Sequence, residues 1–97
     1  MNRKLILHIE AEAEILQAVD WYAERSLVAA RAFVQELTGM MTLASRSPES
    51  WPKGHGDTSH IVFRRFPFDL VFRTKDEMIE IVAVAHQRRR PSYWRNR

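Results

Sequence analysis

The sequence predicts an α+β domain with the order β-αα-βββ, in which a helical hairpin packs on one face of a small, antiparallel-rich sheet. Three observations support this fold class. Apolar residues recur at helical spacing in the N-terminal half, a connection of a few residues joins the two helices, and the spacing changes to two after residue 60. The 97 residues, 45% of them hydrophobic and 28% charged, have the composition of one globular domain, residues 1–97.

The N-terminal half predicts one strand and two helices. Residues 3–9 alternate weakly and are rich in Leu and Ile, which favours a first strand. The helical spacing starts at Glu10, and the acidic residues near this start and Arg25 near the end suit the helix dipole. Ser26 is a typical N-cap for the second helix. Pro48 ends that helix, because the residue before a proline disfavours the helical conformation.

The C-terminal half predicts three strands after a loop at residues 50–57. Residues 60–66 are predicted to form a strand, with Ile61 and Phe63 on one face and Val62 on the other, and residues 69–73 form the next strand. A turn at residues 74–77 follows, although it lacks the glycine that a tight two-residue turn prefers. The last strand, residues 78–85, is almost unbroken in its apolar character. Such a run is typical of a central strand that is buried on both faces.

Several classes of function are excluded or disfavoured by composition. The chain has no cysteine, which excludes disulfides, cysteine-ligated zinc and a thiol nucleophile. The longest apolar run, Ile81–Ala85, is far shorter than the ~20 residues that cross a bilayer, and the apolar stretch near the N-terminus is too short for a signal peptide. We therefore expect a cytoplasmic protein. His55 and His60 are interpreted as loop histidines, so neither a metal nor a cofactor is predicted.

Positive charge is concentrated in the C-terminal half. The net charge of the chain is +3, and the tail, residues 86–97, holds five arginines and no acid. This distribution predicts a polyanionic or acidic partner. Because Tyr93 and Trp94 lie in the same tail, we expect part of it to pack back onto the domain.

The basic residues and their neighbours suggest a candidate site for RNA cleavage. Arg64 and Arg65 are expected to be adjacent on a strand and to point to opposite faces, so that one of them faces the open side of the sheet, where Arg73, one strand over, can join it. Guanidinium groups bind phosphates in a bidentate manner, and a histidine or tyrosine can transfer a proton. The candidate catalytic residues are Arg64, Arg65, His86, Arg89 and Tyr93.

Each of these residues also has a structural interpretation. A single arginine can be solvated or paired with an acid, and His86 can hold the tail through a hydrogen bond. Trp94 is interpreted as an anchor of the tail, and Trp21 and Tyr22 as part of the helix packing. The acidic residues of the strands and turns, Asp57, Asp69, Asp76, Glu77 and Glu80, are interpreted as surface charge.

Taken together, the order and spacing of several short motifs resemble the RelE/ParE superfamily of toxins from bacterial type II toxin–antitoxin modules, also called plasmid-stabilisation proteins. The resemblance covers nearly the whole chain and is closest to the ParE branch. The motifs are Ala11–Ile15 and Trp21-Tyr22 in the first helix, Pro48 after the second, Arg64–Phe68 before the strand 69–73, Ile81–His86, and Arg88–Trp94.

The resemblance implies a growth-inhibiting toxin that a cognate antitoxin neutralises by forming a hetero-oligomer with it. No membrane partner is expected. RelE-like members cut mRNA on the ribosome with a cluster of Lys and Arg and a C-terminal Tyr or His, whereas ParE-like members poison DNA gyrase. The loop before the second strand offers only Lys53, which favours the ParE type. The ribonuclease alternative stays open, as does an inactive nucleic-acid-binding module.

The same residues are predicted to bind the antitoxin or the target. The helical hairpin and an exposed sheet surface are expected to leave apolar residues that the chain cannot all bury. These residues and the basic tail together suit a partner with an acidic, amphipathic segment. The predicted contact residues are Arg64, Arg65, Arg73, Arg88, Arg89, Arg90 and Trp94.

Overall fold

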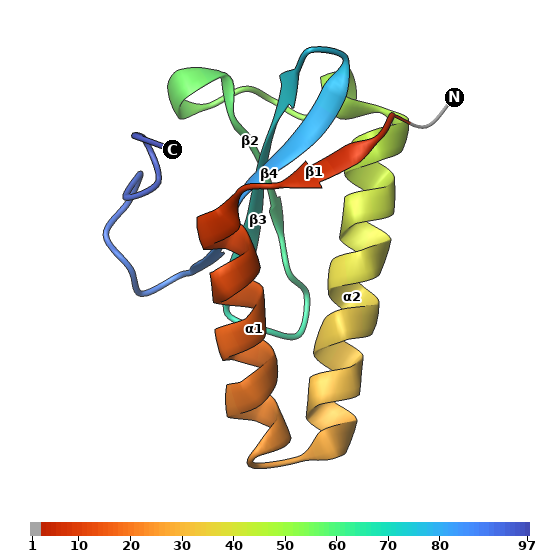
Figure 1. Ribbon diagram of the computed structural model, residues 1–97, viewed down its shortest axis with the longest axis vertical. Coiled ribbons are helices and arrows are strands. Elements are labelled where there is room, and N and C mark those ends of the chain that lie inside the picture. The colour runs from red at the N-terminus through yellow and green to blue at the C-terminus, as the bar shows by residue number, and fades with distance from the viewer. Residues whose placement is uncertain (1–2) are drawn as a thin grey trace.

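The computed structural model describes residues 3–97 and has the predicted element order (Figure 1). A four-stranded sheet has the strand order β1-β4-β3-β2, with β1 parallel to β4 and the other neighbours antiparallel. The elements are β1 (Leu5–Leu7), α1 (Ile9–Ala23), α2 (Leu27–Arg46), β2 (Ser59–Val62), β3 (Phe68–Lys75) and β4 (Met78–His86), with short 3₁₀ turns at Pro48–Ser50 and His55–Asp57.

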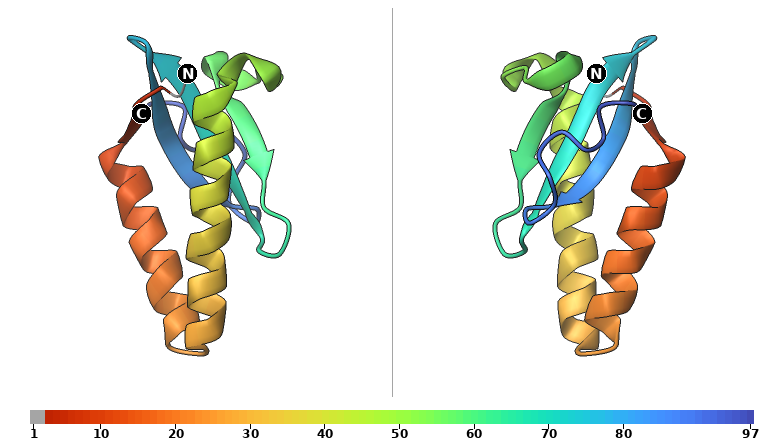
Figure 2. Two further views of the ribbon diagram at one scale, coloured as in Figure 1. Left: turned by 90° about the vertical axis from the view of Figure 1, so that its right-hand side faces the viewer. Right: turned by 90° about the vertical axis from the view of Figure 1, so that its left-hand side faces the viewer.

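The helical hairpin is defined by caps at the start of each helix. The side chain of His8 accepts a hydrogen bond from the backbone of Glu10, and Ser26 Oγ accepts one from Ala29 N at 3.2 Å. Ser26 is therefore the N-cap of α2, as its sequence context predicts. The two helices run antiparallel and cover one face of the sheet (Figures 1 and 2). Within residues 3–97, no helix has the length and apolar character needed to cross a membrane.

The main core lies between the hairpin and the sheet and is centred on Phe33. This side chain is fully buried and contacts four other aromatic rings, with ring centroids 5.2–5.6 Å apart. Tyr22 and Phe63 stack on it, whereas Phe66 and Phe68 meet it edge to face. The aromatic cluster therefore ties α1 and α2 to the β2–β3 side of the sheet.

The predicted central strand is confirmed, because β4 pairs with β1 on one side and β3 on the other and residues 79–85 are all buried. Its pairing with β3 contains a bulge, since Phe72 pairs with Ile81 and Val71 with Ala83, which leaves Val82 without a partner on β3. A bulge of this kind frees the backbone groups of the extra residue from the ladder.

The second face of the sheet is covered by the tail (Figure 2). Trp94 is 7% exposed and packs with Val82, Ala83 and Ala85 of β4. The expectation that the tail packs back is confirmed. The expectation of an open sheet face is wrong, because Trp94 and the half-buried Tyr93 occupy it.

The loops differ from the sequence prediction in two places. The second strand ends at Val62 rather than at residue 66, and the chain then bends through residues 64–67 before β3. The β3–β4 turn is tight even though it has no glycine, because Asp76 and Glu77 both adopt positive φ angles of 51° and 64°. Left-handed backbone at two successive positions is the geometry of a hairpin turn that follows the twist of its strands.

Candidate functional site

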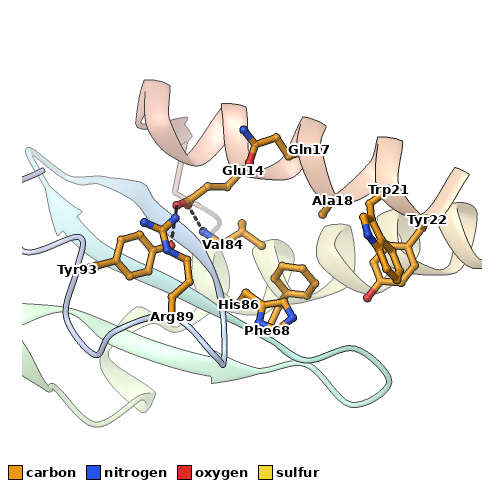
Figure 3. A pocket seen from close by; sticks show the side chains of 10 residues that line it. All are labelled: Glu14, Gln17, Ala18, Trp21, Tyr22, Phe68, Val84, His86, Arg89 and Tyr93. Carbon is orange, nitrogen blue, oxygen red and sulfur yellow. Dashed lines mark hydrogen bonds and ion pairs between the residues drawn. The ribbon is translucent and has the colours of Figure 1, made fainter. Parts of the chain in front are cut away.

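A groove of ≈ 330 Å³ lies between α1 and the end of β4, with the start of the tail at its rim (Figure 3). Its floor is apolar and comes from Ala18, Phe68 and Val84. The side chains around the floor are polar or aromatic and come from α1, β4 and the tail: Glu14, Gln17, Trp21, Tyr22, His86, Arg89 and Tyr93.

The carboxylate of Glu14 fastens the tail to α1 at one end of this groove. Arg97 donates to both of its oxygens, at 3.0 and 2.9 Å, and the hydroxyl of Tyr93 donates to it at 2.6 Å. Arg89 lies 3.5 Å away and stacks its guanidinium 3.7 Å over the Tyr93 ring. The side chains of Glu14 and Arg97 are only 11% and 12% exposed, so this ion pair lies largely out of water.

The position of Glu14 follows from the way the sheet ends. Because β1 pairs only with Ile79–Ile81, the outer edge of β4 has no neighbouring strand beyond that point among residues 3–97. Glu14 accepts a hydrogen bond from Val84 N at 3.0 Å, and Arg97 donates one to the carbonyl of Val82, the bulge residue, at 3.0 Å. Two side chains thus satisfy backbone groups that a strand would otherwise pair.

The protonation of the tail groups is shifted by this arrangement. Burial, together with the hydrogen bond to Glu14 and its negative charge, raises the pKa of Tyr93 well above its ordinary value of 10.0. For Arg97, burial works to lower the pKa, but the hydrogen bond and charge of Glu14 outweigh it, so the net pKa is raised. The Tyr93 hydroxyl is therefore held neutral and Arg97 charged across the ordinary pH range.

Three of the predicted catalytic residues do come together, namely His86, Arg89 and Tyr93, which all line the groove. His86 Nδ1 accepts a hydrogen bond from the backbone of Arg88 at 3.1 Å, and its ring packs edge to face on Phe68. His86 therefore holds the first turn of the tail, in agreement with its structural interpretation. Arg88, Arg89 and Arg90 are exposed along this turn.

Arg64 and Arg65 do not belong to the groove, and the prediction that they alternate across a strand is wrong. Both are exposed in the bend after β2. Their backbone amides donate to the carboxylate of Glu36 on α2, which fixes the bend against the helix. The strand ends before these residues because Phe63 and Phe66 both enter the aromatic core from one side, which an alternating strand cannot provide.

Arg73 is likewise not part of an open basic face. Its Nε donates to Glu80 at 2.8 Å, and its Nη2 donates to the carbonyl of Arg97 at 2.8 Å. Glu80 is 5% exposed, so its interpretation as surface charge is wrong. The end of the tail is thus held from both sides, by Glu14 through the Arg97 side chain and by Arg73 through the Arg97 backbone.

The aromatic residues divide between packing and exposure. Trp94 anchors the tail as predicted, although its Nε1 is buried without a hydrogen-bond partner among residues 3–97. Tyr22 packs on the core, but Trp21 does not: it is 52% exposed at the far end of the groove, and Arg25 stacks 3.6 Å over its ring.

No group of three His, Asp or Glu side chains within residues 3–97 could hold a metal ion. His55 is exposed in its loop, and His60 instead lies 3.7 Å from Asp69 and meets the Trp94 ring edge to face. Glu14, the residue that organises the groove, was not singled out as a functional residue by sequence reasoning. The only signal was that it falls one turn before the apolar residue Ala18 on the helix face that is buried.

Comparison with known proteins gives the family of the chain. The fold is similar to that of a solved structure described as the "Chromosomal ParDE TA system from P. aeruginosa", with a TM-score of 0.74 and 19% sequence identity over 87% of this chain and 95% of that one. No curated protein matches the chain significantly. A sequence profile described as "ParE toxin of type II toxin-antitoxin system, parDE" matches residues 5–91, so the chain belongs to the ParE family of type II toxins.

Proposed function

We propose that this ParE-family protein inhibits growth by binding DNA gyrase in the cytoplasm and that a cognate antitoxin neutralises it. The observation that supports a binding mechanism is that the Glu14 carboxylate holds the tail in place. It engages Arg97 and the hydroxyl of Tyr93, and Tyr93 is the tail residue that a nuclease would need to have free for proton transfer. A toxin that acts by binding requires a well-fixed tail, whereas a nuclease requires a group that exchanges a proton.

The geometry argues against the ribonuclease alternative on two further grounds. The raised pKa of Tyr93 makes its hydroxyl a poor proton donor to a leaving oxygen near neutral pH. Arg64 and Arg65 lie in the bend after β2, outside the groove that contains His86 and Arg89. The five candidate residues therefore do not form one catalytic constellation.

The helical hairpin of the toxin offers a surface on which the antitoxin could dock. A shallow depression between α1 and α2 is lined by Val19, Ala30 and Val34, with Arg31 at its side. An amphipathic helix places apolar side chains at a spacing that fits such a surface, and its acidic residues would meet Arg31. The apolar contacts would supply most of the affinity and the charges the specificity.

The target is tested with purified protein in two parallel assays. We expect the toxin to inhibit supercoiling by gyrase, or to trap gyrase on cleaved DNA, while ribosome-bound mRNA stays intact. Normal supercoiling in the presence of excess folded toxin would reject the gyrase proposal. Cleavage of the mRNA that is lost in Arg89→Ala would favour the ribonuclease instead.

Neutralisation is tested by co-expression with the product of the adjacent gene. We expect a tight complex and relief of growth arrest. Val34→Asp should weaken the complex, because it places a charge in the apolar depression. Leu43→Asp is the matched control, since Leu43 lies on the same helix with a similar exposure of 46% against 41% but outside the depression. Equal weakening by both variants would show that the antitoxin does not dock there.

A further inference from the structure

The groove between α1 and β4 runs beside the part of the β4 edge that no strand of the described chain, residues 3–97, pairs with. β1 leaves β4 after Ile81, and β4 continues to His86. Val84 and His86 of β4 both line the groove, and Ala18 of α1 lines it from the helix side (Figure 3). Residues 82–86 of this edge extend over about 17 Å, at about 3.4 Å per residue, and side chains already bond two of its backbone groups, Val82 O to Arg97 and Val84 N to Glu14.

The backbone of this edge faces the groove. Val84 N points toward α1, because it donates to Glu14. Gln87 N points the opposite way, because it donates to the carbonyl of Pro67 on the β3 side at 2.9 Å. Since the N–H and C=O of one residue point to the same side and alternate along a strand, the carbonyl of Val84 and the amide of His86 face the groove.

The rim of the groove carries an excess of positive charge. Glu14 is the acidic residue that lines it, and Arg97 already contacts this carboxylate through two hydrogen bonds. Arg89 makes the longer contact of 3.5 Å, and its side chain is 54% exposed. Arg88 and Arg90 are exposed on either side of it. A carboxylate arriving from outside would therefore find Arg89 accessible, stacked on the Tyr93 ring and only weakly paired with Glu14.

We propose that this groove receives an extended, acidic segment of the antitoxin, which adds a short strand to β4 beyond the end of β1 and places a carboxylate on Arg89. The inference rests on the proposed neutralisation and assigns a second contact, separate from the depression between the helices. Backbone pairing with Val84 and His86 supplies the register, and an apolar side chain of the segment packs on Phe68 between Gln17 and Trp21. The added segment pairs with the end of β4, next to the Glu14 and Arg97 side chains that bond the edge at Val84 N and Val82 O.

The test uses the complex of the full chain with the full-length product of the adjacent gene. Amide hydrogen exchange followed by NMR should show that the His86 amide slows by at least about tenfold on complex formation. Arg89→Glu should weaken the complex by at least about tenfold, mainly through faster dissociation. Arg95→Glu makes the same charge change on an exposed tail residue outside the groove and should weaken it less than about threefold.

A second pair of variants leaves the arginines untouched. Gln17 is exposed on α1 at the groove, so Gln17→Trp should fill the space and weaken the complex, while Gln17→Ala should leave it intact. Thermal unfolding of each free variant checks that it remains folded. If the complex forms and relieves growth arrest but His86 exchange is unchanged, or if residues 59–62 of β2 are protected in its place, the groove proposal is overturned and neutralisation stands. If no complex forms, the proposed neutralisation fails and the groove proposal with it.

Discussion

Removing the charge of Glu14 should destabilise the protein and release the tail. Breaking a buried ion pair by removing one partner costs about 3–5 kcal/mol. Because the side chains of Glu14 and Arg97 keep 11% and 12% exposure, we expect the lower end, about 3 kcal/mol, for Glu14→Gln. The loss comes mainly from Arg97, which would remain largely buried without its carboxylate.

The expected shift in melting temperature is large for a chain of this size. An unfolding entropy of about 2.1 cal/mol/K per residue gives about 0.2 kcal/mol/K for 97 residues, so 3 kcal/mol lowers Tm by about 15 °C. Circular dichroism measures this shift directly. Limited trypsin digestion gives a second readout, because a released tail should be cut faster after Arg88 and Arg89.

Glu12→Gln is the matched control, since Glu12 lies on the same helix, is exposed and loses the same charge. Its contribution is limited to the helix dipole, about 0.3–1 kcal/mol, or a few degrees in Tm. If Glu14→Gln and Glu12→Gln shift Tm equally and leave the trypsin pattern unchanged, the carboxylate does not hold the tail and the reasoning is refuted.

Three further predictions follow from other contacts. Tyr93 has a raised pKa in the folded state, so the stability that its neutral hydroxyl gives the fold is complete below about pH 10 and is lost as the pH rises above that value. Tyr93→Phe should therefore flatten the decline of stability in alkaline solution, measured by urea unfolding at stepped pH, and an unchanged slope would contradict this. Phe33→Ala should cost about 3–5 kcal/mol in the same assay, because it empties the centre of the aromatic core, and a loss below about 1 kcal/mol would mean that the rings repack. Glu36→Ala should speed amide exchange at Arg64 and Arg65 while the exchange of residues in β4 stays as it is; equal rates before and after would show that Glu36 does not order the bend.

The element order was accessible from the sequence because each element carries its own local signal. Ser26 and Pro48 mark the ends of α2 through backbone preferences, and the apolar run of β4 marks a strand covered on both faces. The β3–β4 turn was placed correctly as well. These features depend on neighbours within a few residues, so a periodicity argument reaches them.

The hydrogen-bond and ion-pair partners of individual side chains could not be predicted from local sequence patterns. Glu14 and Arg97 are separated by more than eighty positions, and Arg73 reaches both Glu80 and the end of the tail. The charge pattern alone predicts that Glu80 is a surface charge and that Arg73 is available to bind a partner. Only the three-dimensional closure of the tail over the sheet decides that both are paired, because long-range contacts leave no periodic trace in the sequence.

The parallel pairing of β1 with β4 also constrains the order in which the protein can fold. Residues 5–7 pair with residues 79–81, and Glu14 pairs with Arg97, so both N-terminal segments depend on residues that are synthesised much later. During synthesis the helical hairpin can form early from contacts within the first fifty residues, but the sheet cannot be completed until the last strand and the tail have been made. The β4 edge beyond β1 and the basic tail that contacts it thus arise together, from residues that are translated after the helical hairpin.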